Sequence, residues 1–226
     1  PAARQRYWAR SMLGFRRVSG ARPNHAHRAL TDLQRLGLVS GVVTQNVDGL
    51  DAASGTRGVI ELHGALDRVV CLRCGARTAR ALLEARLAEA NPGWVERAAV
   101  LISSTETNAD GDAELPAHEV AGFVVVACED CGGVLKPDVV FFGEAVDPTL
   151  VAASYALVER SRALLVLGSS LTVMSGRRFV LRASKLGLPV AIVNRGDTHG
   201  DRFATVRLDG PLEPVLTGAV RALRDG

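Results

Sequence analysis

The stretch that decides the fold is Ala163-Leu164-Leu165-Val166-Leu167, which runs directly into Gly168-Ser169-Ser170. A short, continuous apolar run that ends in small polar residues is typical of a strand buried on both faces of a sheet. A second run, Pro189–Val193, ends in Asn194-Arg195-Gly196, and a third spans Phe203–Leu208. Helical patterns separate these runs, which predicts parallel strands joined by helices.

The same pattern extends through most of the chain. Helices are predicted at Arg6–Phe15, Asn24–Leu36, Ala79–Ala90, Pro148–Arg160, Gly176–Leu186 and Leu212–Leu223. Further strands are predicted at Leu38–Thr44, Val59–Leu62, Arg68–Leu72, Val124–Cys128 and Val139–Phe142. The polar stretch Ser103–Glu119 is expected to be an exposed loop. The predicted fold class is therefore α/β, with a doubly wound, Rossmann-like parallel sheet and a smaller zinc-binding module.

The four cysteines of the chain form two Cys-x-x-Cys pairs, Cys71 with Cys74 and Cys128 with Cys131. Two such turns brought together make the tetrahedral set of four sulfurs that suits Zn²⁺. Two disulfides would use the same cysteines, but Cys-x-x-Cys disulfides are usually redox-active and the chain does not resemble a small secreted scaffold. We therefore expect a structural zinc, since four cysteines leave no open position for catalysis.

Composition limits the function classes. The chain has 226 residues, 47% of them hydrophobic, with a net charge of +3 and 4% aromatic residues. It has no basic, aromatic-interleaved patch, so a zinc-finger-like nucleic-acid module is disfavoured. We therefore expect no direct contact with nucleic acid. The chain also has no run of ~20 apolar residues, so we expect no membrane span.

Polar residues follow three of the predicted strands, where parallel α/β sheets bind their ligands. Gln45, Asn46 and Asp48 offer amides and a carboxylate, although they could simply cap the following helix. Gly168-Ser169-Ser170 suits phosphate oxygens, and Asn194 suits a ribose hydroxyl, although both are also common turn residues. His63 is able to act as a base near neutral pH, but a lone histidine is as often structural. Three such clusters together predict one site of dinucleotide size.

Together these motifs resemble those of the sirtuins, the NAD-dependent protein deacylases. The resemblance runs from about Gln5 to near the carboxyl end. It rests on Thr44–Asp48, His63-Gly64, both cysteine pairs, Lys136–Glu144, Gly168–Leu171 and Asn194. The run Arg6–Arg10, the long insert between the cysteine pairs and residues 168–173 are most similar to the class II branch. That branch includes a mitochondrial sirtuin described as a lipoamidase and ADP-ribosyltransferase.

The resemblance implies NAD and Zn²⁺ as cofactors and an acyl-lysine protein or peptide as the second substrate. It implies that His63 and Asn46 are catalytic, with His63 the general base on a ribose hydroxyl. Nicotinamide leaves, and water then gives free lysine and an O-acyl-ADP-ribose. The implied cofactor-binding residues are Gln45, Asn46, Asp48, Gly168, Ser169, Ser170 and Asn194. The peptide main chain is expected to lie extended along Val140, Phe141, Phe142, Gly143 and Glu144 on one side and Val173 on the other.

The expected division assigns residues 1–67 and 132–226 to the NAD-binding domain and residues 68–131 to the zinc module. Residues 1–22 are expected to belong to the helical module or the cofactor loop. Sirtuins begin with a strand and a Gly-Ala-Gly loop, which do not occur here. We therefore expect this sequence, which begins at Pro1, to be part of a longer protein with its first strand missing. We expect this segment alone to bind NAD weakly or not at all, and to show no deacylation.

Alternative functions are a non-catalytic protein that binds ADP-ribose or an acylated peptide, and a protein ADP-ribosyltransferase. The binding protein is favoured by the missing glycine-rich loop and disfavoured by the presence of both His63 and Asn46. The expected location is the cytoplasm of a bacterium, or the mitochondrion if the chain is eukaryotic.

Overall fold

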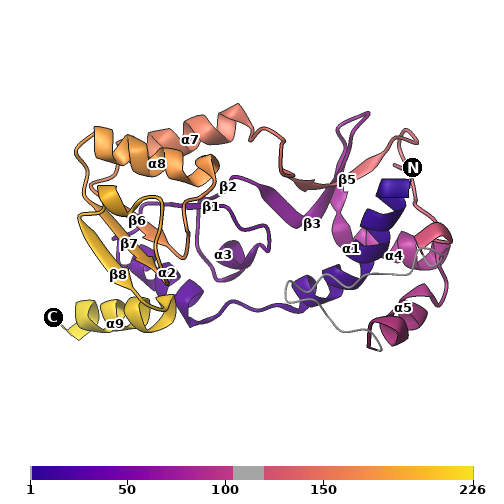
Figure 1. The fold of residues 1–226 in the computed structure, drawn as a ribbon, viewed down its shortest axis with the longest axis horizontal. Coiled ribbons are helices and arrows are strands. Elements are labelled where there is room, and N and C mark those ends of the chain that lie inside the picture. The colour runs from indigo at the N-terminus through magenta and orange to yellow at the C-terminus, as the bar shows by residue number, and fades with distance from the viewer. Residues whose placement is uncertain (1, 104–119, 226) are drawn as a thin grey trace. The chain divides into compact units, whose positions relative to one another are not determined.

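The computed structural model describes residues 2–103 and 120–225, and the predicted loop at Ser103–Glu119 lies outside these ranges apart from its first residue (Figure 1). The chain divides into two compact units. The smaller unit contains residues 1–21 and 65–139, and the larger unit contains residues 22–64 and 140–226. The smaller unit therefore contains the amino-terminal helix as well as both cysteine pairs. It also contains residues 132–139, which the expected division assigned to the NAD-binding domain.

Two parallel sheets form the centre of the larger unit. Strands β6 (Leu164–Leu167), β7 (Val190–Asn194) and β8 (Val206–Asp209) pair in that order. Strand β1 (Val42–Thr44) pairs with β2 (Val59–Glu61) in a separate sheet. All of the carboxyl ends within one parallel sheet meet at one edge, so each sheet delivers the loops that follow its strands to a common side.

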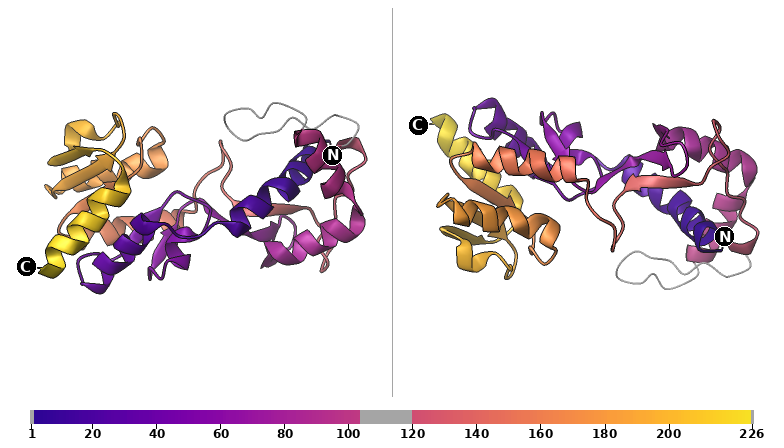
Figure 2. Two further views of the ribbon diagram at one scale, coloured as in Figure 1. Left: turned by 90° about the horizontal axis from the view of Figure 1, so that it is seen from below. Right: turned by 90° about the horizontal axis from the view of Figure 1, so that it is seen from above.

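Helices cover both faces of the three-stranded sheet, as predicted for a doubly wound fold. Helix α8 (Met174–Lys185) packs on one face through Phe179, Val180 and Ala183, beside α7 (Pro148–Glu159). On the other face α9 (Leu212–Asp225) packs with α2 (His25–Arg35) (Figure 2). The short helix α3 (Leu50–Ala53) lies between β1 and β2, and a 3₁₀ turn, η1 (Asp201–Phe203), precedes β8.

The predicted buried strand Leu38–Thr44 is wrong in its first half and in its burial. Helix α2 begins one residue later than predicted, after the N-cap Asn24, and ends one residue earlier, at Arg35, with Leu36 as its C-cap. Gly37 N donates to Gln34 O and Leu38 N donates to Leu33 O, which is the bonding of a Schellman cap. The cap uses Leu38, the first residue of the predicted strand, and β1 begins only at Val42, with three residues that are each partly exposed.

The smaller unit combines helices α1, α4 and α5 with a three-stranded sheet. Helix α1 (Ala2–Gly20) is about twice the predicted length, and α4 (Arg80–Ala90) is followed by α5 (Trp94–Ser103), which was not predicted. Strand β3 (Gly64–Cys71) pairs with β4 (Arg77–Ala79) on one side and β5 (Leu135–Val139) on the other. The core is formed by side chains from all of these helices and from β3, among them Trp8, Met12, Val69, Leu83, Leu87 and Trp94.

Residues 124–128 do not form the predicted strand, because a side chain takes the place of a neighbouring strand. The buried Asn91 accepts from Val124 N at 2.6 Å and donates to Val124 O at 2.9 Å. Its amide therefore satisfies the main chain of Val124 without a ladder of backbone bonds. The third strand of the sheet is instead β5, whose edge position tolerates Pro137.

A buried cation ties α1 to α4 within the smaller unit. The Arg80 guanidinium lies 5.0 Å from the ring centre of Trp8 and 4.7 Å from that of Phe15. It also pairs with Glu84 at 2.5 Å and donates to Ser11 Oγ at 3.3 Å. Burial lowers the pKa of Arg80 and raises that of Glu84, whereas their mutual attraction acts in the opposite direction on each. The helical patterns of α1 and α4 in the sequence did not indicate that Arg80 and Glu84 would form a buried pair.

Among the helices that the structure describes, none is long and apolar enough to cross a membrane.

Two leucines on one helix test the assigned core. Leu87 of α4 is 0% exposed, whereas Leu82 on the same helix is 63% exposed. We predict that Leu87→Ala lowers the free energy of unfolding by roughly 2–5 kcal/mol, because it leaves a cavity. The matched change Leu82→Ala should alter it by less than about 0.5 kcal/mol. Denaturant unfolding of the zinc-loaded protein measures both, and equal effects would contradict the packing of α4.

Candidate active site and metal centre

His63 is held on both ring nitrogens by neighbours in the larger unit. Its Nδ1 lies 3.0 Å from the main-chain oxygen of Gln45, and its Nε2 lies 3.0 Å from Ser175 Oγ. The side-chain Nε2 of Gln45 donates to the same Ser175 oxygen at 2.9 Å. A longer contact, 3.5 Å, joins Ser169 Oγ to Gln45 Oε1. The imidazole is thus a fixed part of a polar network and not a freely rotating side chain.

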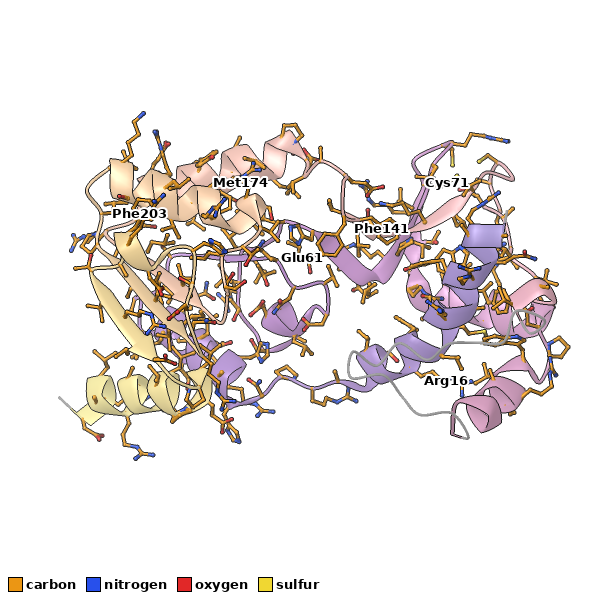
Figure 3. The ribbon with its side chains drawn as sticks, viewed as in Figure 1. Arg16, Glu61, Cys71, Phe141, Met174 and Phe203 are labelled. Carbon is orange, nitrogen blue, oxygen red and sulfur yellow. The ribbon has the colours of Figure 1, made fainter. Side chains whose placement is uncertain are left out.

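The network forms because each member follows a strand or begins a helix. Gln45 comes directly after β1, and His63 follows β2 by two residues. Ser169 lies two residues beyond β6, and Ser175 is the second residue of α8, next to Met174 (Figure 3). The predicted convergence of the strand ends therefore places Gln45, His63 and Ser169 together. Their roles in catalysis and cofactor binding stay predictions.

A second polar group lies around Asn194 and Gly168. Both residues line a pocket of about 360 Å³ at the carboxyl ends of β6, β7 and β8. The other residues that line it are Asn24, Ala26, Arg195, Gly210, Pro211, Leu212 and Glu213. Asn194 Nδ2 donates to the carbonyls of Arg195 and Gly196 at 2.9 and 3.0 Å, which leaves Oδ1 as an acceptor within the described part of the chain. An acceptor at this place suits a sugar hydroxyl.

The remaining predicted cofactor residues differ in how they are placed. Ser170 is exposed, and its hydroxyl bonds with that of Thr172 at 3.0 Å. Asp48 accepts from Leu50 N at 3.0 Å, so one of its oxygens serves the start of α3, as the simpler interpretation proposed. Asn46 is exposed, and its main-chain N donates to Thr44 Oγ1. These three residues are therefore not part of the network around His63.

The predicted peptide-binding segment adjoins His63 directly. Val140 N donates to the main-chain oxygen of His63 at 2.9 Å. Val139 ends strand β5, but the expected extension through Phe142 is wrong. Glu144 N donates to Phe141 O and Phe141 N donates to the Glu144 carboxylate, each at 2.9 Å. These bonds close a turn that leaves Phe142 100% exposed. The side chain of Val173 is also exposed.

Four sulfurs in the smaller unit form the second site. The Sγ atoms of Cys71, Cys74, Cys128 and Cys131 all lie within 4.8 Å of one another. The separations Cys71–Cys131 and Cys74–Cys128 are 3.5 and 3.9 Å. Four sulfurs at ~2.3 Å from a tetrahedral Zn²⁺ would be about 3.8 Å apart, so the arrangement fits this ion. Cys71 is labelled in Figure 3.

The two cysteine pairs adopt the same backbone turn. Gly75 N donates to Cys71 O at 2.9 Å, and Gly132 N donates to Cys128 O at 2.8 Å. These glycines have φ angles of +74° and +68°, a region that other residues rarely adopt. The glycine after each Cys-x-x-Cys pair thus completes a turn that points two sulfurs at one place.

The protonation of the thiols differs within this cluster. A hydrogen bond from the Cys74 backbone holds the pKa of the Cys71 thiol down, to about 6. Burial raises the pKa of Cys131 to about 12. Thiols bind zinc as thiolates, so loading the site must release protons, and zinc affinity should fall as the solution becomes more acidic.

Sequence reasoning gave Ser175 and Gly176 no part in this network. The only signal was a serine followed by glycine where a helix begins, which is a common helix start. Their importance depends on Gln45, which is distant in the sequence. A Cβ atom at Gly176 would lie 2.8 Å from Gln45 Cδ, so the glycine is what lets the amide approach Ser175.

The comparisons with known proteins agree with this geometry. The Sir2 family profile matches residues 3–175. This chain belongs to the Sir2 family. The predicted resemblance to the sirtuins is thereby confirmed, together with the α/β fold class.

Relatives of this Sir2 family member include a bacterial protein deacetylase and a human lipoamidase. NAD-dependent protein deacetylase 1 of Streptomyces coelicolor is 56% identical over 217 residues, which cover 96% of this chain and 71% of that protein. Human NAD-dependent protein lipoamidase sirtuin-4, a mitochondrial protein, is 45% identical over 216 residues, which cover 94% of this chain and 67% of that protein.

Solved Sir2 structures share the fold. A mutant Sir2 homologue in complex with ADP ribose has a TM-score of 0.75 at 28% identity, covering 98% of this chain and 74% of that one. Sir2 bound to an acetylated peptide has a TM-score of 0.68 at 26% identity, covering 95% and 74%.

The metal centre gives a direct prediction. We expect about one zinc per chain in protein purified under reducing conditions, and Cys128→Ser should lose this zinc and destabilise the smaller unit. The control is Asp130→Ala, which changes an exposed residue inside the same turn. Elemental analysis and thermal unfolding measure both effects. Zinc-free protein that is fully folded would refute the site.

Proposed function

We propose that this Sir2 family member removes acyl groups from lysine side chains of proteins in an NAD-dependent reaction. The observation that carries the proposal is the network that fixes His63 beside Gln45 and Ser169, at the ends of strands from two sheets. The relatives named as NAD-dependent deacetylases and as a lipoamidase support the same class of reaction. A protein that only bound ADP-ribose would have no need for a base held in this way.

The residues of the larger unit fit NAD. The pocket at Gly168 and Asn194 has room for a sugar, and Asn194 offers it an acceptor. A Cβ atom at Gly168 would lie 3.1 Å from Leu212, so the absence of a side chain at Gly168 avoids crowding on this side of the pocket. Gln45, Asn46, Asp48, Ser169 and Ser170 would complete the cofactor site. When bound, NAD supplies a ribose carbon that becomes reactive as nicotinamide leaves.

His63 would hold and move the proton. Its Nε2 is the nitrogen that faces the Ser175 hydroxyl, whereas Nδ1 is occupied by a main-chain carbonyl. A hydroxyl group of the substrate that took the place of the Ser175 hydroxyl at Nε2 would therefore meet the one nitrogen able to accept its proton. Asn46, exposed on the same loop as Gln45, is placed to contact the substrate rather than the base.

The acylated protein would bind at the turn that follows β5. The main chain of Val140 is fixed to His63, so a peptide that pairs with this segment would bring its lysine toward the base. Phe142 and Val173 offer exposed apolar contacts for the substrate chain. Zinc would hold the smaller unit together and take no part in the reaction.

A single substitution tests this function. In the full-length protein, His63→Ala should reduce NAD-dependent release of nicotinamide from an acetyl-lysine peptide by roughly 10²–10⁴-fold, because the base is lost. NAD affinity measured by calorimetry should change little, since Nε2 does not hold the pocket at Asn194. His25→Ala, an exposed histidine on α2, is the control. Near-normal turnover by His63→Ala would assign His63 a structural role only.

A further inference from the structure

The hydrogen bonds around His63 have only one consistent direction when the ring is neutral. A main-chain carbonyl only accepts, so the Gln45 oxygen requires a proton on His63 Nδ1. A neutral imidazole then carries a lone pair on Nε2, which must accept. The only partner at Nε2 among the described residues is Ser175 Oγ, at 3.0 Å. Ser175 therefore donates its single proton to His63.

The rest of the network supports this direction from the other end. Leu171 N donates to Ser169 Oγ at 3.2 Å, so the proton of Ser169 is available for Gln45 Oε1. That contact orients the Gln45 amide with its oxygen toward Ser169 and its NH₂ group toward Ser175. An NH₂ group only donates, so Ser175 accepts from Gln45 and keeps its own proton for His63.

Burial makes the Ser175 hydroxyl hard to replace. Ser175 is 7% exposed, so little water reaches the place of its side chain. Gly176 leaves room for the Gln45 amide, whose Nε2 would be 3.1 Å from a Cβ atom at that position. The arrangement therefore depends on a serine and a glycine that are adjacent at the start of α8.

We infer that Ser175 is a positioning residue that, together with the Gln45 carbonyl, holds His63 in the tautomer with its proton on Nδ1 and its lone pair on Nε2. This inference rests on the proposed function of His63 as the base. The other neutral tautomer would put a proton on Nε2, where it could accept nothing from a substrate hydroxyl. Ser175 thus favours the form of the ring whose Nε2 is able to accept a proton once a substrate hydroxyl takes the place of the serine hydroxyl.

The tautomer can be measured without any reaction. In ¹⁵N–¹H correlation spectra of the NAD-free, zinc-loaded protein at alkaline pH, His63 should show a protonated Nδ1 and an unprotonated Nε2. Ser175→Ala should weaken the preference, so that a minor fraction with its proton on Nε2 appears, because the Gln45 carbonyl alone then holds the ring. Gly176→Ala should do the same by displacing Gln45. A proton on Nε2 in the natural protein, or an unchanged tautomer in both variants, would overturn the inference whether or not the protein is a deacylase.

Kinetics separate a positioning role from a general structural one. Ser175→Ala should lower kcat for an acetyl-lysine peptide by about three- to tenfold, the effect expected for one neutral hydrogen bond, while the KM values for NAD and peptide change little. Ser175→Thr, which keeps the hydroxyl, should recover most of this loss. Ser184→Ala, an exposed serine on the same helix, is the matched control.

The outcomes of the two experiments remain distinguishable. Equal losses of kcat in Ser175→Ala and Ser175→Thr, or full activity in Ser175→Ala, would overturn the role of the hydroxyl. Absence of turnover by the full-length natural protein would refute the proposed function, and the spectra would still decide whether Ser175 sets the tautomer.

Discussion

The side chain of Gln45 connects two sheets that share no strand pairing among the described residues. Its oxygen meets Ser169 after β6, its nitrogen meets Ser175 at the start of α8, and its main chain holds His63 after β2. One amide therefore brings together loops that the backbone alone leaves independent. The polar network, and the proposed base within it, depend on this bridge.

The two units contribute in different ways. The smaller unit is organised by local turns, because each cysteine pair completes its own backbone turn and the sulfurs meet as a result. The larger unit is organised by long-range side-chain contacts, because its polar residues come from separate strands. Loss of a sulfur is thus expected to act on folding, whereas loss of a network hydroxyl is expected to act on the chemistry.

Much of this arrangement could be predicted from the sequence because it has a short-range signal. The apolar runs of β6 and β7 and the spacing of the cysteines each have one physical interpretation that dominates. Residues 124–128 have a strand-like composition, but the buried Asn91 satisfies the main chain of Val124 instead. The strand predicted at Leu38 fails because a helix cap uses its first residues. Ser175 was missed because its significance depends on partners 112 and 130 positions away.

The central claim is that a fixed histidine in this Sir2 family member couples NAD to lysine deacylation. The most direct measurement is the stoichiometry of products formed by the full-length, zinc-loaded protein from NAD and an acetyl-lysine peptide. The account predicts equal amounts of nicotinamide and deacetylated peptide, with neither formed when NAD is omitted. Nicotinamide released without deacetylated peptide, or deacetylation that does not require NAD, would contradict it.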